Sequence, residues 1–434
     1  MKTLFMLAVL PMALAAQGPA TADSLHPITL ERAIELATTN SPSAISAEGQ
    51  VRTSSAAVTS AYAALIPNLS WSMSQRQSTG IAQNPNGQFV SIVQPWTYST
   101  SLSSSLTLFD GGRMFDNIRT AKASVHSAEA NQVTQRYTIA LNVKTQYYNI
   151  LAAEESEAAA QAQLQQAQEQ LKVSVAKLTA GAVTRSDSLR SAIAVGNARL
   201  ALLNARNNKK VASASLTRLV GTPYLVTATP SDTLDQALTP VDSTTMAQLA
   251  LNGPAVRSAE AALATAKAAN SSAFGGYLPS ISIAYSRGGS GSDKYYGLGG
   301  GSLRYNKGLT LSLRYNIFDN WTREETRARA DVGVVNARAS LRDAQMAAQQ
   351  SVVQFVASLE TLEEQLRIQQ QSVAAAEEDL RVQQQRYAAG ASTLLDVLTS
   401  QTALNQARVQ LIQYRLNYRT TKAQIEQLIG RNLN

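Results

Sequence analysis

LTAGAVTRSD at 178–187 and YAAGASTLLD at 387–396 are two versions of one turn, and they lie roughly 210 residues apart in the chain. In each stretch a glycine suits the left-handed conformation that ends a helix, and Thr-x-x-Asp is typical of a capping box that starts the next helix. The two stretches therefore predict two helical hairpins with their turns here. Turn chemistry is sufficient to explain both glycines and both Thr-x-x-Asp motifs.

Other short motifs recur in the same order at nearly the same spacing. The pairs are LIPNL at 65–69 with YLPSI at 277–281, LFD at 108–110 with IFD at 317–319, and LVG at 219–221 with LIG at 428–430. A period this long does not suit a solenoid unit, so we predict one duplicated structural half. We assign 23–221 to the first repeat, 222–242 to a proline-containing connector or equatorial segment, and 243–434 to the second repeat.

Two long stretches are predicted to be coiled-coil helices. From about Arg113 to Leu178, and from about Thr322 to Tyr387, no proline interrupts the chain and apolar residues recur every seven positions. At about 1.5 Å per residue, each such helix would be on the order of 100 Å long. Helices of that length are not needed in a compact domain, and they would cross much of a periplasm.

Each half also contains two stretches in which apolar and polar residues alternate, which predicts strands. We place the strands at about 68–76 and 96–109 in the first half, and at about 280–287 and 303–318 in the second. The glycine-rich stretch 288–301 is expected to be a loop. Alternation fits a soluble sheet with one buried face as well as a membrane sheet with lipid on one face and water on the other.

The N-terminus is typical of a cleavable export signal: Lys2 precedes an apolar stretch, and a small-x-small site precedes Asp23. We therefore predict a signal peptide at 1–22. Past it we find no run of about 18 apolar residues, so any membrane insertion is expected to use strands. Four strands leave unpaired edges in lipid, so several chains must combine. The residues expected to face the lumen of such a barrel are Thr310, Ser312, Arg314 and Asn316.

The composition argues against an enzyme and against a nucleic-acid partner. The chain has 0 cysteines and 2 histidines, His26 and His126, which lie far apart in sequence. A thiolate or histidine metal site, a catalytic triad and a lipoprotein anchor are therefore not expected, and neither is a cofactor. The net charge of +8 comes from basic residues scattered along helices, and export makes nucleic acid an implausible partner.

Taken together, these features resemble the TolC-like outer-membrane efflux protein family over essentially the whole mature sequence. The resemblance rests on the duplicated halves, the Leu-x-Pro junctions, the junction Phe109-Asp110-Gly111-Gly112, and the tip from Tyr387 to Leu398. It implies a mainly α fold with a β-barrel part. In that fold, three chains form a 12-stranded barrel in the outer membrane of a Gram-negative bacterium and an α-barrel in the periplasm.

The resemblance also implies a function and its partners. Such a homotrimer is a passive exit duct of a tripartite efflux or type I secretion system. Its tips dock onto a periplasmic membrane fusion (adaptor) protein, which links to an inner-membrane pump of the resistance-nodulation-division, ABC or major-facilitator type. The small residues that match the docking tips are Gly181, Ala182, Gly390 and Ala391.

The family resemblance places the gate at the periplasmic entrance. Tyr387 matches a gate tyrosine and Asp396 matches an acidic ring, whereas Ser392 and Thr399 stand where the family has an arginine and a second acidic residue. We hypothesise that three copies of Asp396 crowd the narrow entrance and favour cations.

Three alternatives compete with the duct. A structural periplasmic coiled-coil adaptor without a channel is disfavoured by the alternating strands. An outer-membrane enzyme would need an acid, base or nucleophile constellation that the sequence does not supply. A general diffusion porin carries many more strands per chain and lacks long helices.

Overall fold

The computed structural model describes residues 25–229, 243–293 and 303–433, which are mostly helical. Two compact units divide the chain: unit 1 comprises 1–45, 135–248 and 351–434, and unit 2 comprises 46–134 and 249–350. The predicted signal segment at 1–22 and part of the predicted connector, 230–242, lie outside the described residues. No helix in the described ranges is both long and apolar enough to cross a bilayer.

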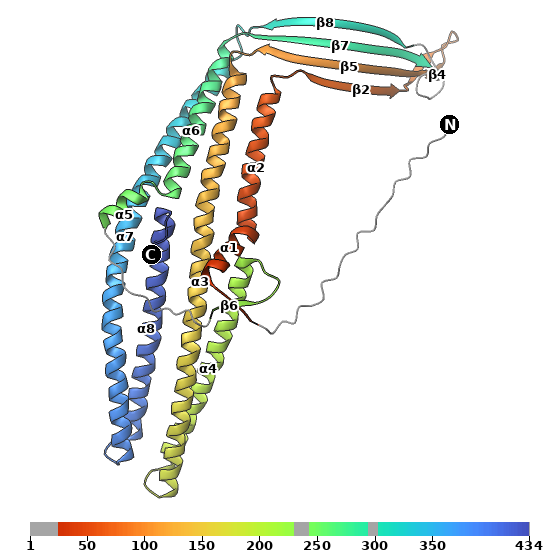
Figure 1. Ribbon diagram of the computed structural model, residues 1–434. Coiled ribbons are helices and arrows are strands. Elements are labelled where there is room, and N and C mark those ends of the chain that lie inside the picture. Colours follow the sequence, from red (N-terminus) through yellow and green to blue (C-terminus); the bar gives the residue numbers. More distant parts are fainter. Residues whose placement is uncertain (1–24, 230–242, 294–302, 434) are drawn as a thin grey trace. The chain divides into compact units, whose positions relative to one another are not determined.

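The long helices are present as predicted and dominate the ribbon in Figure 1. Helices α3 (Arg113–Thr179) and α7 (Thr322–Ala388) each contain 67 residues and run through both units. The return helices are α4 (Arg185–Val220) and α8 (Leu394–Ile429). The shorter helices are α1 (Leu30–Asn40), α2 (Pro42–Ala63), α5 (Ser243–Ala250), α6 (Pro254–Phe274) and the 3₁₀ turn η1 (Gly275–Tyr277).

The core of unit 1 lies where α3 packs with α1, α4 and the C-terminal part of α8. A small parallel pair, β1 (His26–Ile28) with β6 (Val226–Ala228), joins this core. Tyr147 of α3 is buried between them: its hydroxyl donates to the carbonyl oxygen of Ile28 at 3.1 Å and accepts from the N–H of Thr229 at 3.1 Å. Neither α1 nor this strand pair was predicted from the sequence.

Unit 2 contains an antiparallel sheet with the order β2-β5-β7-β8, drawn as the four long arrows in Figure 1. The strands are β2 (Asn68–Arg76), β5 (Trp96–Phe109), β7 (Ser280–Asp293) and β8 (Arg304–Arg314). A separate hairpin, β3 (Thr79–Gln83) with β4 (Phe89–Val93), was not predicted. Its turn is held by Asn84, whose side-chain oxygen accepts from the N–H groups of Asn86 and Gln88.

Two predicted boundaries in the second half are wrong. The loop predicted at 288–301 begins too early, because Gly288 and Gly289 belong to β7 and pair with Asn306 and Tyr305. The ring of Tyr305 lies against Gly289, so the glycine provides space for a neighbouring side chain. Strand β8 ends at Arg314 instead of about 318, and Asn316 therefore follows the strand.

The register gives the sheet two faces of opposite chemistry. The hydroxyl face carries, among others, Ser70, Ser72 and Ser74 of β2, Ser99, Ser101 and Ser103 of β5, Ser282 and Ser286 of β7, and Thr310 and Ser312 of β8. Serine pairs bond across β2 and β5 on this face, with oxygen separations of 2.7 to 3.3 Å. The apolar face carries Leu69, Trp71, Met73, Leu102, Ile281, Ile283, Tyr285, Leu309, Leu311 and Leu313.

Candidate functional site: the hairpin tips and the strand faces

Both predicted tips are tight turns between helices of unit 1. Gly181 and Gly390 adopt left-handed backbone angles, with φ of +71° and +79°, and both are exposed. The N–H of Ala182 donates to the carbonyl oxygen of Lys177 at 2.8 Å, and the N–H of Ala391 donates to that of Arg386 at 2.7 Å. These bonds satisfy carbonyl groups at the helix ends. The four small residues of the tips are thus at the solvent-exposed ends of the hairpins.

Asp396 closes a capping box at the start of α8. Its backbone N–H donates to Thr393 Oγ1 at 3.3 Å, while its carboxylate accepts from the N–H and the hydroxyl of Thr393, each at 2.8 Å. The bond from the Thr393 N–H, followed by that from its hydroxyl, lowers the pKa of Asp396. Asp396 is exposed, so its negative charge is available to solutes as well as to the cap.

Tyr387 is buried at the end of α7, with only 4% of its surface exposed. The ammonium group of Lys177, from α3, lies 4.1 Å from the centroid of its ring and donates to its backbone carbonyl oxygen. The Tyr387 hydroxyl has no hydrogen-bond partner among the described residues. The ring also lines a groove between α3 and α7, beside Gln165, Gln166, Glu169 and Gln170.

Ser392 and Thr399, which were expected to replace an arginine and a second acidic residue of the family, make local bonds. The Ser392 hydroxyl donates to the carbonyl oxygen of Gln383 at 3.3 Å, and the Thr399 hydroxyl donates to that of Leu395 at 2.9 Å. The Ser392 side chain therefore bonds back to the C-terminal part of α7, and Thr399 bonds within α8. Arg386 is the arginine nearest the second tip, where its guanidinium donates to the carbonyl oxygen of Ala391 at 3.3 Å.

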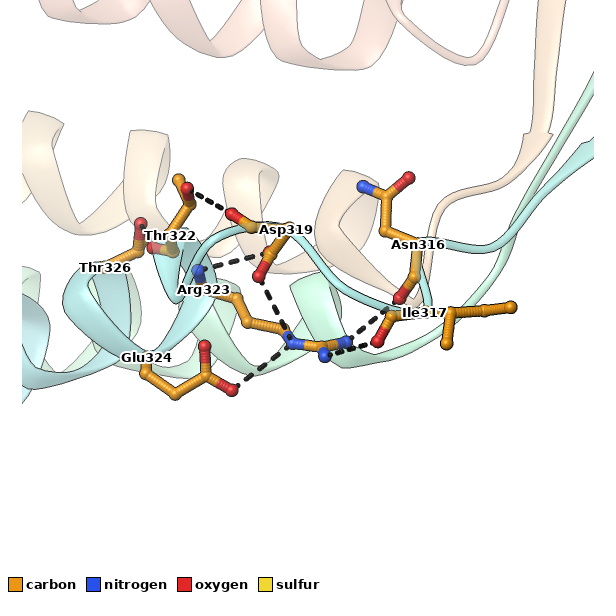
Figure 2. Close-up of polar contacts among 7 residues, drawn as sticks. All are labelled: Asn316, Ile317, Asp319, Thr322, Arg323, Glu324 and Thr326. Atoms are coloured by element: carbon orange, nitrogen blue, oxygen red, sulfur yellow. Dashed lines mark hydrogen bonds and ion pairs between the residues drawn. The ribbon is translucent and has the colours of Figure 1, made fainter.

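The four residues predicted to face a lumen do not all share one element. Thr310, Ser312 and Arg314 lie on the hydroxyl face of β8, whereas Asn316 lies in the connection to α7. Figure 2 shows the reason: Arg323 donates to the carbonyl oxygens of Asn316 and Ile317, each at 3.2 Å. These bonds hold the segment between β8 and α7 against the first turn of α7, so this segment does not continue β8.

Arg323 is also held by acidic residues. Its Nε lies 3.8 Å from an Asp319 carboxylate oxygen and 3.4 Å from one of Glu324, and its guanidinium lies over the ring of Tyr277. The backbone N–H of Arg323 donates to Asp319 as well, at 3.3 Å. Arg323 therefore fixes the strand-to-helix junction of the second half (Figure 2).

The two strand-to-helix junctions share an unusual backbone. Gly111 and Gly112 have positive φ angles of +75° and +87° in the first half. Asn320 and Trp321, which follow the matching Asp319, have φ of +56° and +64°. An L-residue in this region costs roughly 1–2 kcal/mol relative to glycine. The second junction thus keeps the turn at an energetic cost that the contacts of Arg323 offset.

Sequence reasoning missed Lys177, Arg386 and Arg323. Each acts through a contact with backbone carbonyl groups, and such a contact leaves no pattern of residue types. For Arg323, the one available signal was its position four residues after the repeated aspartate of IFD.

Comparisons with known proteins identify the family. The family described as outer membrane efflux protein matches residues 33–222 and 246–431. The pyoverdine export outer membrane protein OpmQ of Pseudomonas aeruginosa is 25% identical over 330 residues, covering 74% of this chain and 67% of that protein. Protein CyaE of Bordetella pertussis is 26% identical over 356 residues, covering 79% and 71%.

A solved structure supports the same fold. A crystal structure of CusC superposes with a TM-score of 0.76 at 19% identity, covering 96% of each chain. Together with the match of the family over most of the chain, this leaves one assignment. The chain belongs to the outer membrane efflux protein family, whose fold is that of outer-membrane channels with a large periplasmic helical part.

Proposed function

We propose that three copies of this chain form the passive exit duct of a tripartite efflux or type I secretion system. The observation that carries this proposal is the four-stranded sheet of unit 2, whose edge strands are β2 and β8. Unpaired edge groups are costly in lipid, so a four-stranded sheet needs neighbours on both sides. Three copies placed edge to edge supply 12 strands, a number within the range of closed outer-membrane barrels.

The chemistry of the two faces supports an orientation for each strand. Leu309, Leu311 and Leu313 expose 69–70% of their surface, which is unfavourable in water and favourable against lipid tails. The hydroxyl face, including Thr310, Ser312 and Arg314, then lines the lumen. Small hydroxyl groups bond to one another and to water, so this lining presents a weakly polar wall to a passing solute.

The two hairpin tips of unit 1 support a docking surface for a periplasmic partner. Gly181, Ala182, Gly390 and Ala391 are exposed and small, which permits close approach of a helical hairpin from a periplasmic adaptor. In this arrangement Tyr387, Ser392, Asp396 and Thr399 lie at or near the entrance. An inner-membrane pump, joined through the adaptor, supplies the energy for transport.

Membrane insertion is tested with single cysteines, because the natural chain contains 0 cysteines. We expect Ser312→Cys to react with a water-soluble thiol reagent in lipid vesicles and Leu311→Cys to be protected. The purified protein should have the mass of a trimer and conduct ions in planar bilayers. A monomer that leaves the membrane without detergent and conducts nothing would instead support the structural coiled-coil adaptor.

Docking is tested by photocrosslinking in cells. A photoreactive residue at Ala391 should capture a periplasmic adaptor, whereas one at Gln413, an exposed position within α8, should not. Equal capture at both positions would contradict docking through the tips.

A further inference from the structure

Two cations lie directly opposite each other on the apolar face of the sheet. Arg287 of β7 pairs with Lys307 of β8 in the antiparallel register, and both side chains are exposed. Lys307 shares its face with Leu309, Leu311 and Leu313 because side chains alternate along a strand. Like charges directly opposite one another destabilise a strand pair, so this arrangement favours an anion between the two side chains.

The surroundings hold Arg287 in place. Its guanidinium lies 5.1 Å from the ring centroid of Tyr305. That ring lies against Gly289, where an added Cβ would come within 2.7 Å of a ring carbon. Because Gly289 has no side chain, the Tyr305 ring has space to lie beside Arg287. A guanidinium that stacks on a ring can still donate its N–H groups to a further partner.

No carboxylate of the sheet neutralises the pair. Among the described strands β2, β5, β7 and β8, the only acidic residue is Asp293. It lies six residues beyond Arg287, which is about 20 Å along an extended strand. The two positive charges therefore have no acidic neighbour within the sheet.

The position of the pair matches a membrane boundary. The helices of unit 2 join the sheet at the end where β8 finishes, and Lys307 lies six residues, or about 20 Å, before Leu313. Three rows of apolar residues fill this distance on β7 and β8. Because the strands of an outer-membrane barrel are tilted by roughly 40°, these rows cover about 15 Å of an apolar band that is typically about 25 Å tall. Trp71 lies in the same cross-strand row as Arg287, as expected for an aromatic residue at the interface.

We propose that Arg287 and Lys307 bind the phosphate of a phosphorylated glycolipid in the outer leaflet, on the outside of the sheet. The proposal rests on the proposed function, which places the apolar face in lipid. A guanidinium can donate two parallel hydrogen bonds to a phosphate and an ammonium adds a point charge, while the acyl chains lie along the leucine rows.

The test is native mass spectrometry of the purified full-length protein in detergent, titrated with a bisphosphorylated lipid A. We expect the double variant Arg287→Gln/Lys307→Gln to bind at least about tenfold more weakly, because charge-assisted hydrogen bonds are lost. Arg287→Lys/Lys307→Arg should retain binding. Arg304→Gln is the matched control, because Arg304 lies on β8 but on the hydroxyl face.

Other outcomes would overturn the proposal. These are equal binding by the double variant, an equal loss in Arg304→Gln, equal binding of a dephosphorylated lipid A, or saturation of the site by inorganic phosphate alone at the lipid's concentration.

Nitroxide labels at Leu311 and Ser312 distinguish failure of the phosphate site from failure of the proposed duct. If Leu311 is accessible to oxygen and Ser312 to a water-soluble nickel chelate, the sheet is oriented as proposed, and absent lipid binding refutes only the phosphate site.

Discussion

The Lys177 ammonium lies over the ring of Tyr387 and donates a hydrogen bond to the carbonyl oxygen of the same residue. Lys177 is near the end of α3 and Tyr387 is near the end of α7, so this contact joins the two hairpins of unit 1 near their tips. Ser392, which the sequence resemblance places at the position of a family arginine, bonds within its own hairpin. A lysine from the first hairpin thus provides a cross-hairpin contact in this chain.

Removing this contact should make the entrance open more readily. We expect Lys177→Met to raise the open population by between about twofold and about thirtyfold, because a cation over an aromatic ring contributes about 0.5–2 kcal/mol. Single-channel recording in planar bilayers would measure the change. Lys172→Met is the control, because Lys172 lies on the same helix and its one ion pair among the described residues is with Glu169, one turn away. Unchanged gating in Lys177→Met would show that the contact does not restrain the entrance.

Local chemistry explains which parts of this region could be predicted. The capping boxes at Thr184 and Thr393 could be predicted from the sequence, because a capping box involves residues that are three positions apart. The long helices could be predicted because their apolar repeat continues over many turns. The contact between Lys177 and Tyr387 could not be predicted, because the two residues are far apart in sequence and no local motif pairs them.

The sheet illustrates the same limit. The alternation of apolar and polar residues predicted the observed bounds of β2 and β5, because the two faces of these strands differ clearly in polarity. It failed at Gly288 and Gly289, where glycine was interpreted as a loop signal although Tyr305 packs against it across the ladder. It also failed at Asn316, since Arg323 ends the strand by binding carbonyl groups beyond Arg314.

Asp396 should control ion preference at the entrance. We expect Asp396→Asn to lower the potassium-to-chloride permeability ratio toward parity. Asp187→Asn is the matched control, because Asp187 forms the equivalent capping box at the first tip but is not part of the proposed ring of carboxylates at the entrance. Both variants lose the carboxylate of a capping box, so a similar loss of stability is expected. An equal change of selectivity in both would contradict a ring of Asp396.

The pH dependence of this preference follows from the lowered pKa of Asp396. The carboxylate stays ionised in the folded protein below the ordinary aspartate pKa of about 4. Its contribution to stability is fully present above the unfolded pKa and is lost as the pH falls through the folded pKa. Crowding of three carboxylates raises the pKa of each and opposes this effect. We therefore expect cation preference in conductance measurements to be lost only below about pH 6, and a loss that is already complete at about pH 7 would contradict this assignment.

The backbone at Asn320 and Trp321 should be strained in a way that glycine relieves. We expect Asn320→Gly to raise the free energy of unfolding, by up to about 1 kcal/mol, because glycine adopts a positive φ without a steric penalty. The midpoint of thermal unfolding of the purified protein would report this change. Gly111→Ala is the opposing control at the first junction, where a Cβ would clash with the backbone of Gly275. A fall in the midpoint for Asn320→Gly would show that its side chain stabilises the turn.

Two buried lysines in unit 1 should respond oppositely to replacement. Lys144 forms an ion pair with Glu426, so Lys144→Met leaves a buried carboxylate without this partner and should cost about 3–5 kcal/mol. The Lys422 ammonium is buried and has no hydrogen-bond partner among the described residues. Lys422→Met should therefore be neutral or stabilising at pH 7, as measured by chemical unfolding.

The pH dependence distinguishes this explanation for Lys422 from a simple gain in packing. Burial lowers the pKa of Lys422, so between its folded and unfolded pKa values the unfolded chain binds more protons. In the natural protein, stability should therefore rise with pH across that interval, as the penalty for the buried charge disappears. The advantage of Lys422→Met should shrink toward pH 10 for this reason. An advantage that stays constant with pH would mean that methionine acts through packing alone.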